Sequence, residues 1–143
     1  MEDLVAEKFS LKALQSYMDD SPFIHQTGMR VVAADPDNEA LTITMPLKPE
    51  FERQAGTGQF HGGPIASLID TAGCFALIML LGHGVPTVNF RTDYLRPAIN
   101  TSLRAVAQVR RVGRMVGVVD IDVFDDNDRL LAVGRGTFGS QSG

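Results

Sequence analysis

The segment from Pro64 to Leu81 is apolar almost throughout and holds a single charged residue, Asp70, near its middle. A helix that is apolar on every side is expected to be buried, because it has no polar face to turn toward water. Burying an unpaired carboxylate is costly unless its pKa rises and the group becomes neutral. An acid in such a place is more often kept for chemistry than for stability. Asp70 is therefore the first candidate catalytic residue.

The same segment is close to the minimum length for crossing a membrane. Its central carboxylate argues against a membrane span, and no second apolar span follows. We therefore expect the buried helix of a soluble protein that does not associate with membranes.

The composition is that of an ordinary soluble protein, with 44% hydrophobic and 21% charged residues over 143 positions. This length predicts one domain over residues 1–143. The net charge of −4 disfavours nucleic-acid binding, which normally requires a basic excess. The acidic N-terminus lacks the pattern of a signal peptide, and the single cysteine, Cys74, leaves no internal disulfide. Both features favour the cytoplasm.

Turn residues and apolar periodicity predict a short helix, a long helix and six strands. The short helix is expected at about residues 10–19, with Ser10 as a possible cap and Ser21-Pro22 as its end. The long helix covers 64–81, and strands are expected at 29–34, 40–45, 87–95, 102–112, 115–124 and 130–138. In strand 87–95, strict alternation places Thr87 and Phe90 on opposite faces. The layout is α+β, with one antiparallel sheet that wraps around the long helix.

At 100° per residue, small side chains surround Asp70 on the long helix. Its own face carries Gly63, Ala66, Ser67, Gly73, Cys74 and Leu77, whereas the opposite face carries Ile65, Leu68, Ala72, Phe75, Ala76 and Met79. The large side chains are expected to pack into the sheet, and the small ones to leave room for a partner or a ligand. Tight packing alone is the alternative explanation for Gly73 and Ala66.

The helix begins at His61-Gly62-Gly63-Pro64, where backbone N–H groups have no partner within the helix. Glycines let a ligand approach these donors, which can then polarise a carbonyl and hold a developing oxyanion. Gly62 and Asp70 are eight residues apart, roughly 12 Å along a helix axis. Both cannot contact one substrate carbonyl from the same chain. Two antiparallel copies of the helix would bring them together, which predicts a site shared across a two-fold dimer interface.

Three stretches of the sequence resemble the hotdog-fold acyl-CoA thioesterases, in particular the phenylacetate-pathway (PaaI-like) group. They are His61 to Gly73, Thr87 to Ala98 with its Tyr-Leu-Arg-Pro-Ala run, and Ala132 to Phe138. The resemblance implies a curved antiparallel sheet around a central helix, a homodimer or a dimer of dimers, and hydrolysis of a coenzyme A thioester. It implies no cofactor, because coenzyme A is part of the substrate.

By position, the resemblance implies that Gly62 donates its N–H to the thioester carbonyl. Asp70 of the other chain would be the nucleophile or the base that activates water, and Thr87 would carry a hydroxyl that positions this water. Many members have Asn or Gln about six residues before His-Gly-Gly, where this chain has Ala55. Gln54 and Gln59 are the candidate replacements.

The remaining candidates belong to substrate binding rather than to chemistry. Gly63 and Cys74 lie near the expected site, and Cys74 is expected to be a small buried side chain rather than a nucleophile, since no paired histidine accompanies it. His61 is expected to position the substrate, with a general-base role as the alternative. His25 and His83 read as loop residues, no metal-ligand spacing is present, and the acids of Asp125 to Asp128 read as a solvated turn.

Arg110, Arg111 and Arg114 cluster at one predicted hairpin. Arginine binds phosphates through its planar fork, so these residues are candidates for holding the phosphates of coenzyme A, with a solvated strand end as the alternative. The acyl group is left open, because an aryl or a medium aliphatic chain could be lined by Phe51, Phe60, Leu77 and Tyr94. Two rival functions remain: a non-catalytic acyl-CoA or aromatic-ligand binding module, and a hydratase or dehydratase of the same fold. The hydratase would typically need a histidine paired with the acid, and no such pair accompanies Asp70.

Overall fold

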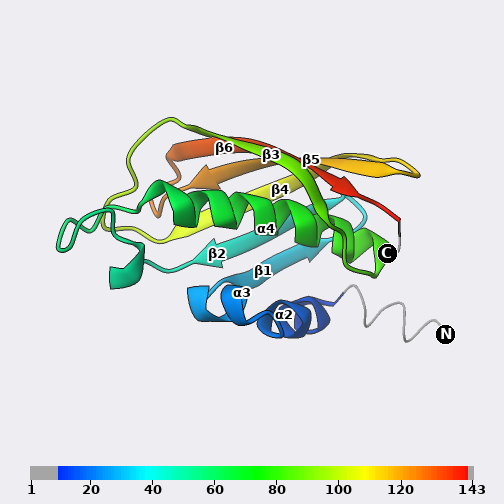
Figure 1. Cartoon of the computed structure of the whole chain (residues 1–143), viewed down its shortest axis with the longest axis horizontal. Helices are drawn as coiled ribbons and strands as arrows, with labels where there is room; N and C mark the ends of the chain where they lie inside the picture. The colour runs from blue at the N-terminus through cyan, green and yellow to red at the C-terminus, as the bar shows by residue number, and fades with distance from the viewer. Residues whose placement is uncertain (1–9, 142–143) are drawn as a thin grey trace.

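In the computed structural model, which describes residues 10–141, a curved six-stranded antiparallel sheet wraps around one long helix (Figure 1). Two short helices, α2 and α3, precede the sheet. The elements in chain order are α2 (Leu11–Asp19), α3 (Pro22–Thr27), β1 (Arg30–Asp35), β2 (Ala40–Met45), a 3-10 turn η1 (Pro49–Phe51), α4 (Gly62–Leu81), β3 (Thr87–Tyr94), β4 (Leu103–Val112), β5 (Val116–Phe124) and β6 (Leu130–Gly139). The predicted α+β layout and the hotdog fold are confirmed, and each predicted strand boundary lies within one residue of the observed one.

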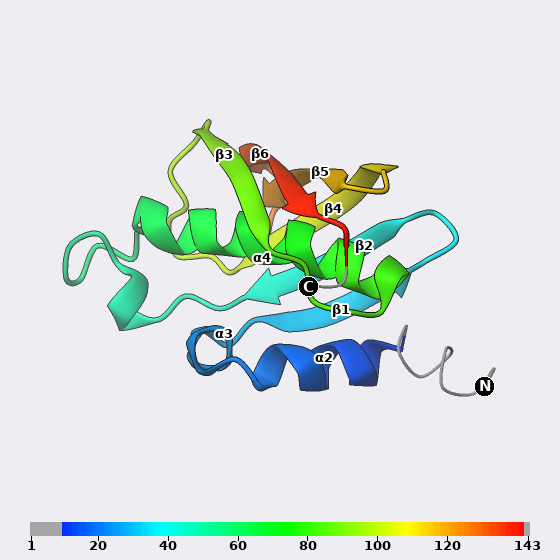
Figure 2. The same cartoon turned by 45° about the vertical axis from the view of Figure 1, so that its right-hand side comes forward.

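The strand order across the sheet is β1-β2-β4-β5-β6-β3, so β1 and β3 form its two edges. All five pairings are antiparallel. In Figure 2 the sheet curls over α4 from β1 and β2 below it to β3 above it. This curvature places residues from both ends of β3 beside the long helix.

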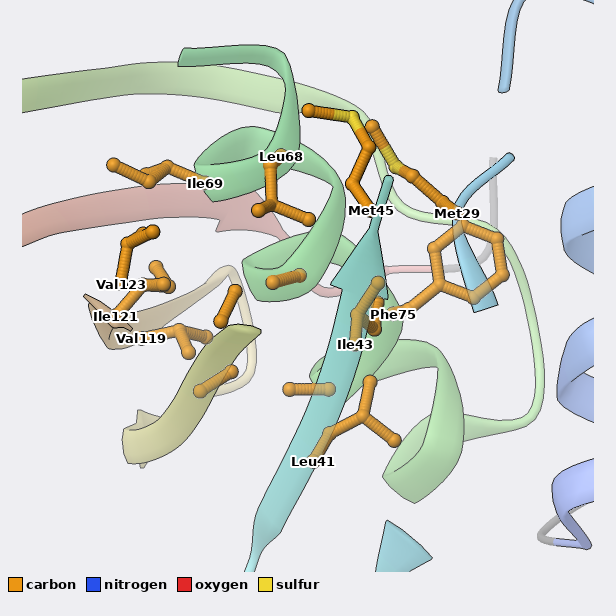
Figure 3. Packing of buried hydrophobic residues seen from close by; sticks show 14 of the residues in the cluster. Met29, Leu41, Ile43, Met45, Leu68, Ile69, Phe75, Val119, Ile121 and Val123 are labelled. Atoms are coloured by element: carbon orange, nitrogen blue, oxygen red, sulfur yellow. The ribbon is translucent and has the colours of Figure 1, made fainter. Parts of the chain in front are cut away.

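The inner face of the sheet and α4 form the hydrophobic core (Figure 3). Alternate residues of β2, β4 and most of β5 are buried, as a sheet with one buried face requires. Fully buried side chains from the strands and the helix include Leu41, Ile43, Met45, Leu68, Ile69, Leu103, Val119, Ile121 and Val123. α4 is long and apolar enough to cross a membrane by length and composition, but 61% of its most apolar window is buried inside the protein. It is the core helix of the fold.

Close helix–sheet packing corrects part of the predicted helix faces. A side-chain Cβ at Gly73 would lie 2.8 Å from the Phe138 ring and 3.2 Å from Ile121, so Gly73 faces the sheet and not the side of Asp70. Leu77 is likewise fully buried and contacts the position of Gly117 on β5. The alternative explanation, tight packing, therefore holds for Gly73. The periodicity argument failed here because the sheet wraps far enough to bury more than one side of α4.

The helix α3 was not predicted, because Ser21-Pro22 reads as a helix end. In the structure Ser21 instead caps a new helix: its hydroxyl accepts a hydrogen bond from the Ile24 N–H, and Pro22 occupies a first-turn position. α3 ends at Gly28, whose φ of 77° is left-handed. This helix lies beside α4 and, as described below, forms one wall of a hollow at Asp70.

The two edges of the sheet differ in protection. At the β1 edge, the side-chain amide of Gln15 on α2 accepts from the Val31 N–H at 2.8 Å and donates to the Met29 carbonyl at 3.2 Å. At the β3 edge, Val88 and Tyr94 are 64% and 53% exposed. A long edge strand that exposes large apolar side chains is a typical site of strand pairing with another chain.

The turn of Asp125 to Asp128 is less solvated than predicted. Asp125 is 4% exposed, and its carboxylate accepts hydrogen bonds from the N–H groups of Asn127 and Arg129 and from Arg129 Nε. These bonds, with the Arg129 backbone N–H foremost, hold the pKa of Asp125 below its ordinary value. The acid organises the hairpin between β5 and β6.

Candidate active site

Asp70 and Thr87 are brought together by the packing of β3 against α4. The Thr87 hydroxyl donates a hydrogen bond of 2.8 Å to Oδ1 of Asp70. The two residues are 17 positions apart in the sequence and lie on different elements. One carboxylate oxygen is thus oriented by a neighbouring hydroxyl, which leaves the other oxygen available to a water molecule or a substrate.

A β-bulge makes this contact possible. The pairing of β3 with β6 shifts between Thr87 and Asn89, so that Thr87 lies opposite Phe138 and Phe90 lies opposite Gly136. Phe138 and Gly136 are both on the inner side of β6. The bulge therefore turns Thr87 to the same face as Phe90, which corrects the strict alternation predicted for this strand.

Asp70 is less buried than the apolar sequence around it predicts. It is partly exposed and opens into a hollow of about 220 Å³ between α3, α4 and the start of β3. The hollow is lined by Ser21, Phe23, Ile24, Ser67, Asp70, Thr71, Cys74, Phe75 and Thr87. α3 and β3, on either side of the helix, leave this part of the α4 surface uncovered in the single chain.

Cys74 is one turn beyond Asp70 and lines the same hollow. Its thiol donates to the Val85 carbonyl at 3.5 Å. Burial, followed by the nearby charge of Asp70, raises the pKa of Cys74 to about 11. Because the thiolate is the reactive form of cysteine, this thiol is a wall of the hollow rather than a nucleophile.

The start of α4 is a second polar centre. His61 is the N-cap, and its Nδ1 accepts from the Gly63 N–H at 3.3 Å. Gly62 is the first residue of the helix, and its carbonyl accepts a 2.7 Å hydrogen bond from the Tyr94 hydroxyl. The Gly62 N–H belongs to the first turn and has no partner within the helix. Of the two glycine N–H groups, Gly62's is therefore the one that can bind a ligand.

Gly62 lines a separate hollow of about 430 Å³ at the other end of β3. Its walls are Arg53, Gln59, Phe60, His61, Gly62, Ile65, Tyr94, Leu95, Arg96, Pro97 and Ala98. No residue is shared with the hollow at Asp70. The structure thus keeps the two predicted catalytic centres apart within one chain, as the ~12 Å axial separation along the helix requires.

The glutamines proposed to replace an amide at Ala55 lie on the loop before α4. Gln59 lines the hollow at Gly62, whereas Gln54 is exposed and its carbonyl accepts from Thr57. Of the two, only Gln59 lines this hollow. Phe60 and Tyr94 also line it, Phe51 lines a neighbouring hollow, and Leu77 is sealed in the core.

Of the three arginines of the β4–β5 hairpin, one is engaged by an acid. Arg110 points to the outer face of the sheet, where its Nε is 3.6 Å from Asp120, and Asp120 is also bound by Arg135. Arg111 lies close to Gly113 in the turn. Sequence reasoning missed two other arginines, Arg53 and Arg96, which line the hollow at Gly62 and form no ion pair with residues 10–141. Arg53 precedes the His61-Gly62-Gly63 motif and Arg96 lies within the Tyr-Leu-Arg-Pro-Ala run, and this position was the available sequence signal.

No group of three or more His, Cys, Asp or Glu residues that could hold a metal ion occurs within residues 10–141.

Comparison with known proteins agrees with this architecture. The profile of the thioesterase superfamily matches residues 57–132, which include α4 and strands β3 to β5. The chain belongs to the thioesterase superfamily. The acyl-coenzyme A thioesterase PaaI of Escherichia coli is 30% identical over 110 residues, 76% of this chain and 75% of that protein. A protein of Halobacterium salinarum, whose esterase assignment is provisional, is 36% identical over 136 residues, 87% of this chain and 88% of that protein.

Solved structures of thioesterase-superfamily proteins share the fold. Thioesterase HI1161 from Haemophilus influenzae superimposes with a TM-score of 0.81 at 25% identity, covering 91% of this chain and 89% of that one. The PaaI protein of the Escherichia coli phenylacetic acid degradation operon gives a TM-score of 0.77 at 25% identity, covering 94% and 98%. The similarity to the PaaI-like group inferred from the three sequence stretches is confirmed. The superfamily and the PaaI relative support thioester hydrolysis as the general activity of this chain.

Proposed function

We propose that this protein hydrolyses acyl-CoA thioesters in the cytoplasm, with Asp70 as general base or nucleophile and the Gly62 N–H as the donor to the thioester carbonyl. The observation that carries the proposal is the 2.8 Å hydrogen bond from Thr87 to Asp70 at the edge of an open hollow. A carboxylate held by one hydroxyl and open on its other side suits the activation of a water molecule.

In the general-base form, the free carboxylate oxygen of Asp70 accepts a proton from water as the water oxygen attacks the thioester carbon. The carbonyl oxygen becomes an oxyanion, which the Gly62 N–H and the positive end of the α4 dipole stabilise. The C–S bond then breaks, and the thiolate of coenzyme A takes the proton. In the nucleophile form, the carboxylate attacks the carbon first and the C–S bond breaks, so coenzyme A leaves as a thiolate. Water then hydrolyses the mixed anhydride, which releases the acid, regenerates the Asp70 carboxylate and supplies the proton that the thiolate takes. No cofactor is needed in either form.

A second copy of the chain would complete the site. β3 carries Thr87 beside Asp70 at one end and Tyr94 beside Gly62 at the other. If two β3 edges pair antiparallel, the Thr87 end of one strand meets the Tyr94 end of its partner. Asp70 would then approach Gly62 of the partner subunit, and the two-fold axis would generate two equal sites. The exposed apolar side chains of β3 support this pairing, and a dimer of dimers would keep it.

The phosphates of coenzyme A would bind to arginines. Arg53 and Arg96 line the hollow that contains Gly62 and have no carboxylate partner among the described residues. Arg111 and Arg114 at the β4–β5 hairpin remain candidates, whereas Arg110 is engaged by Asp120. Gly63, Gln59 and Cys74 would line the substrate path, with Gln54 at its rim. Neither a nucleic acid nor a membrane takes part.

The experiment that tests the function is release of free coenzyme A by the purified protein from a panel of acyl-CoA thioesters, repeated with Asp70→Asn. This change keeps the size and hydrogen bonding of the side chain but removes the base, so kcat should fall at least ~10²-fold in a folded protein. Turnover by the Asp70→Asn variant close to that of the wild type would remove Asp70 from the mechanism. Tight binding of acyl-CoA without any release by the wild type would instead support the non-catalytic binding module.

A further inference from the structure

Beside the hollow at Asp70 lies a third hollow, of about 210 Å³, lined by Phe23, Gln26, Thr27, Met45, Phe51, Gly63, Pro64 and Ser67. The two hollows share two residues, Phe23 on α3 and Ser67 on α4. They therefore adjoin along the groove between these helices, and both touch Phe23 and Ser67. Ser67 lies one turn from Asp70 on α4.

The two hollows differ in chemistry. The one at Asp70 carries the hydrogen-bonded pair of Asp70 and Thr87, together with Thr71 and Ser21. The other is walled mainly by Met45, Phe51, Pro64 and Phe23 and contains no acidic or basic side chain. A molecule that lies in both would place a polar group beside Asp70 and an apolar tail between α3 and the start of α4.

Helix geometry gives the length of the groove, and the third hollow gives its volume at one end. From Asp70 to Pro64 the helix axis advances roughly 9 Å over six residues. An extended alkyl chain with ~1.5 Å bonds gains roughly 1.3 Å per carbon, so about six to eight carbons would span this distance. The inner hollow of about 210 Å³ also exceeds the ~150 Å³ cavity that holds a benzene ring in an engineered protein.

Resting on the proposed hydrolysis, we infer that the acyl group binds in this α3–α4 groove and that Phe23 and Ser67 select acyl tails of about six to eight carbons. Ser67, with its small side chain, leaves the passage open between the two hollows. Phe23, which is 57% exposed, forms the outer wall of both and closes the groove against water. The apolar residues at the inner end, Met45 and Phe51, are buried and close the groove there, so a longer tail needs an opening at the Phe23 wall.

The test is the ratio of kcat/KM for hexanoyl-CoA to that for acetyl-CoA, with phenylacetyl-CoA and decanoyl-CoA as further substrates. Ser67→Leu fills the passage and should lower the hexanoyl-to-acetyl ratio at least tenfold. Phe23→Ala removes the outer wall and should raise the decanoyl-to-hexanoyl ratio. A high phenylacetyl rate would identify an aryl tail, and a high hexanoyl rate an aliphatic one. The matched control is Thr42→Leu, which makes a similar change on β2, outside both hollows.

Unchanged ratios in both Ser67→Leu and Phe23→Ala would overturn the inference. Phe23 is exposed, so its truncation keeps the test valid if Ser67→Leu fails to fold.

A binding measurement separates this inference from the proposed function: calorimetry with S-ethyl-CoA and S-hexyl-CoA, thioethers that cannot be hydrolysed. Burial of methylenes gives about fourfold in affinity each, so the hexyl compound should bind at least ~10-fold tighter, and Ser67→Leu should abolish the difference. Equal affinities for S-ethyl-CoA and S-hexyl-CoA would overturn the proposed acyl groove even if the enzyme is active. The predicted difference in affinity without any hydrolysis would overturn only the proposed reaction.

Discussion

Thr87→Val tests whether the hydroxyl of Thr87 acts through Asp70. The substitution keeps a β-branched side chain of nearly the same shape on β3 and removes only the donor to Asp70 Oδ1. The carboxylate would then be free to rotate and would no longer hold its second oxygen toward the hollow. The expected effect is on kcat rather than on folding.

The magnitude follows from the geometry of the contact. Hydrogen bonds to charged groups contribute about 1.5–3 kcal/mol when buried. Thr87 is exposed and Asp70 only partly buried in the single chain, so a value just below this range, ~1.4 kcal/mol, is appropriate. This corresponds to a decrease in kcat of about tenfold. In an Asp70→Asn background the base is already absent, so Thr87→Val should then lower kcat less than twofold.

The assay is steady-state release of free coenzyme A by the wild type, the two single variants and the double variant. The control is Thr92→Val on the same strand, whose buried hydroxyl has no hydrogen-bond partner within residues 10–141. Removing an unsatisfied buried hydroxyl should leave kcat within twofold and the melting temperature unchanged or higher. Equal losses from Thr87→Val in both backgrounds, or none in either, would refute the role of Thr87 as the group that orients Asp70.

Three further predictions concern substrate phosphates, the thiol and acid stability. Arg53→Ala should raise KM for acyl-CoA several-fold and spare an acyl-pantetheine, whereas Arg110→Ala should change neither; equal effects of Arg53→Ala on both substrates would reject phosphate binding. Because the pKa of Cys74 is about 11, only ~10⁻³ of the thiol is ionised at pH 8, so alkylation by iodoacetamide in the native state should be far slower than in urea. Asp70→Asn should accelerate it only modestly, since burial is the larger cause. Because the pKa of Asp125 is lowered in the folded state, its carboxylate stabilises the fold at pH values above the ordinary pKa of 3.8, and this stabilisation is lost as the pH falls below 3.8. Asp125→Asn should therefore flatten the decline of the melting temperature between pH 5 and 2.5. A decline as steep as that of the wild type would contradict this.

The sequence predicted most of the fold because local patterns and the global structure agree. The long apolar helix, the Gly82 end and the four C-terminal strands are each marked by periodicity and turn residues, and all lie within two residues of their predicted bounds. The helix α3 was missed because its cap, Ser21-Pro22, has the same composition as a helix stop. Local sequence carries no information on whether the chain continues as a helix after such a pair.

The site was predicted less completely because it depends on long-range geometry. The residue types of Asp70 and Gly62 point to chemistry from the sequence alone. The bulge that turns Thr87 toward Asp70 is invisible in the alternation of the strand, because one extra residue reverses the faces. The direction of Arg110 likewise depends on a bulge, because the register of β4 with β5 shifts between Val109 and Arg111 and leaves Arg110 beside Asp120.

The central claim is that each active site combines Gly62 of one chain with Asp70 of the other, and mixed dimers of two inactive variants test it most directly. Gly62→Pro removes the N–H donor at the first helical position, where proline is well tolerated, and the extended backbone of His61 suits a residue before proline. A Cβ at this position would lie 3.1 Å from the Tyr94 hydroxyl, so the variant must first be shown to fold and dimerise. Refolding equal amounts of Gly62→Pro and Asp70→Asn together should restore up to roughly one quarter of wild-type activity, because half of randomly paired dimers are mixed and each mixed dimer has one intact site. Well-folded mixed dimers without activity would show that the site is built within a single chain and would contradict the account.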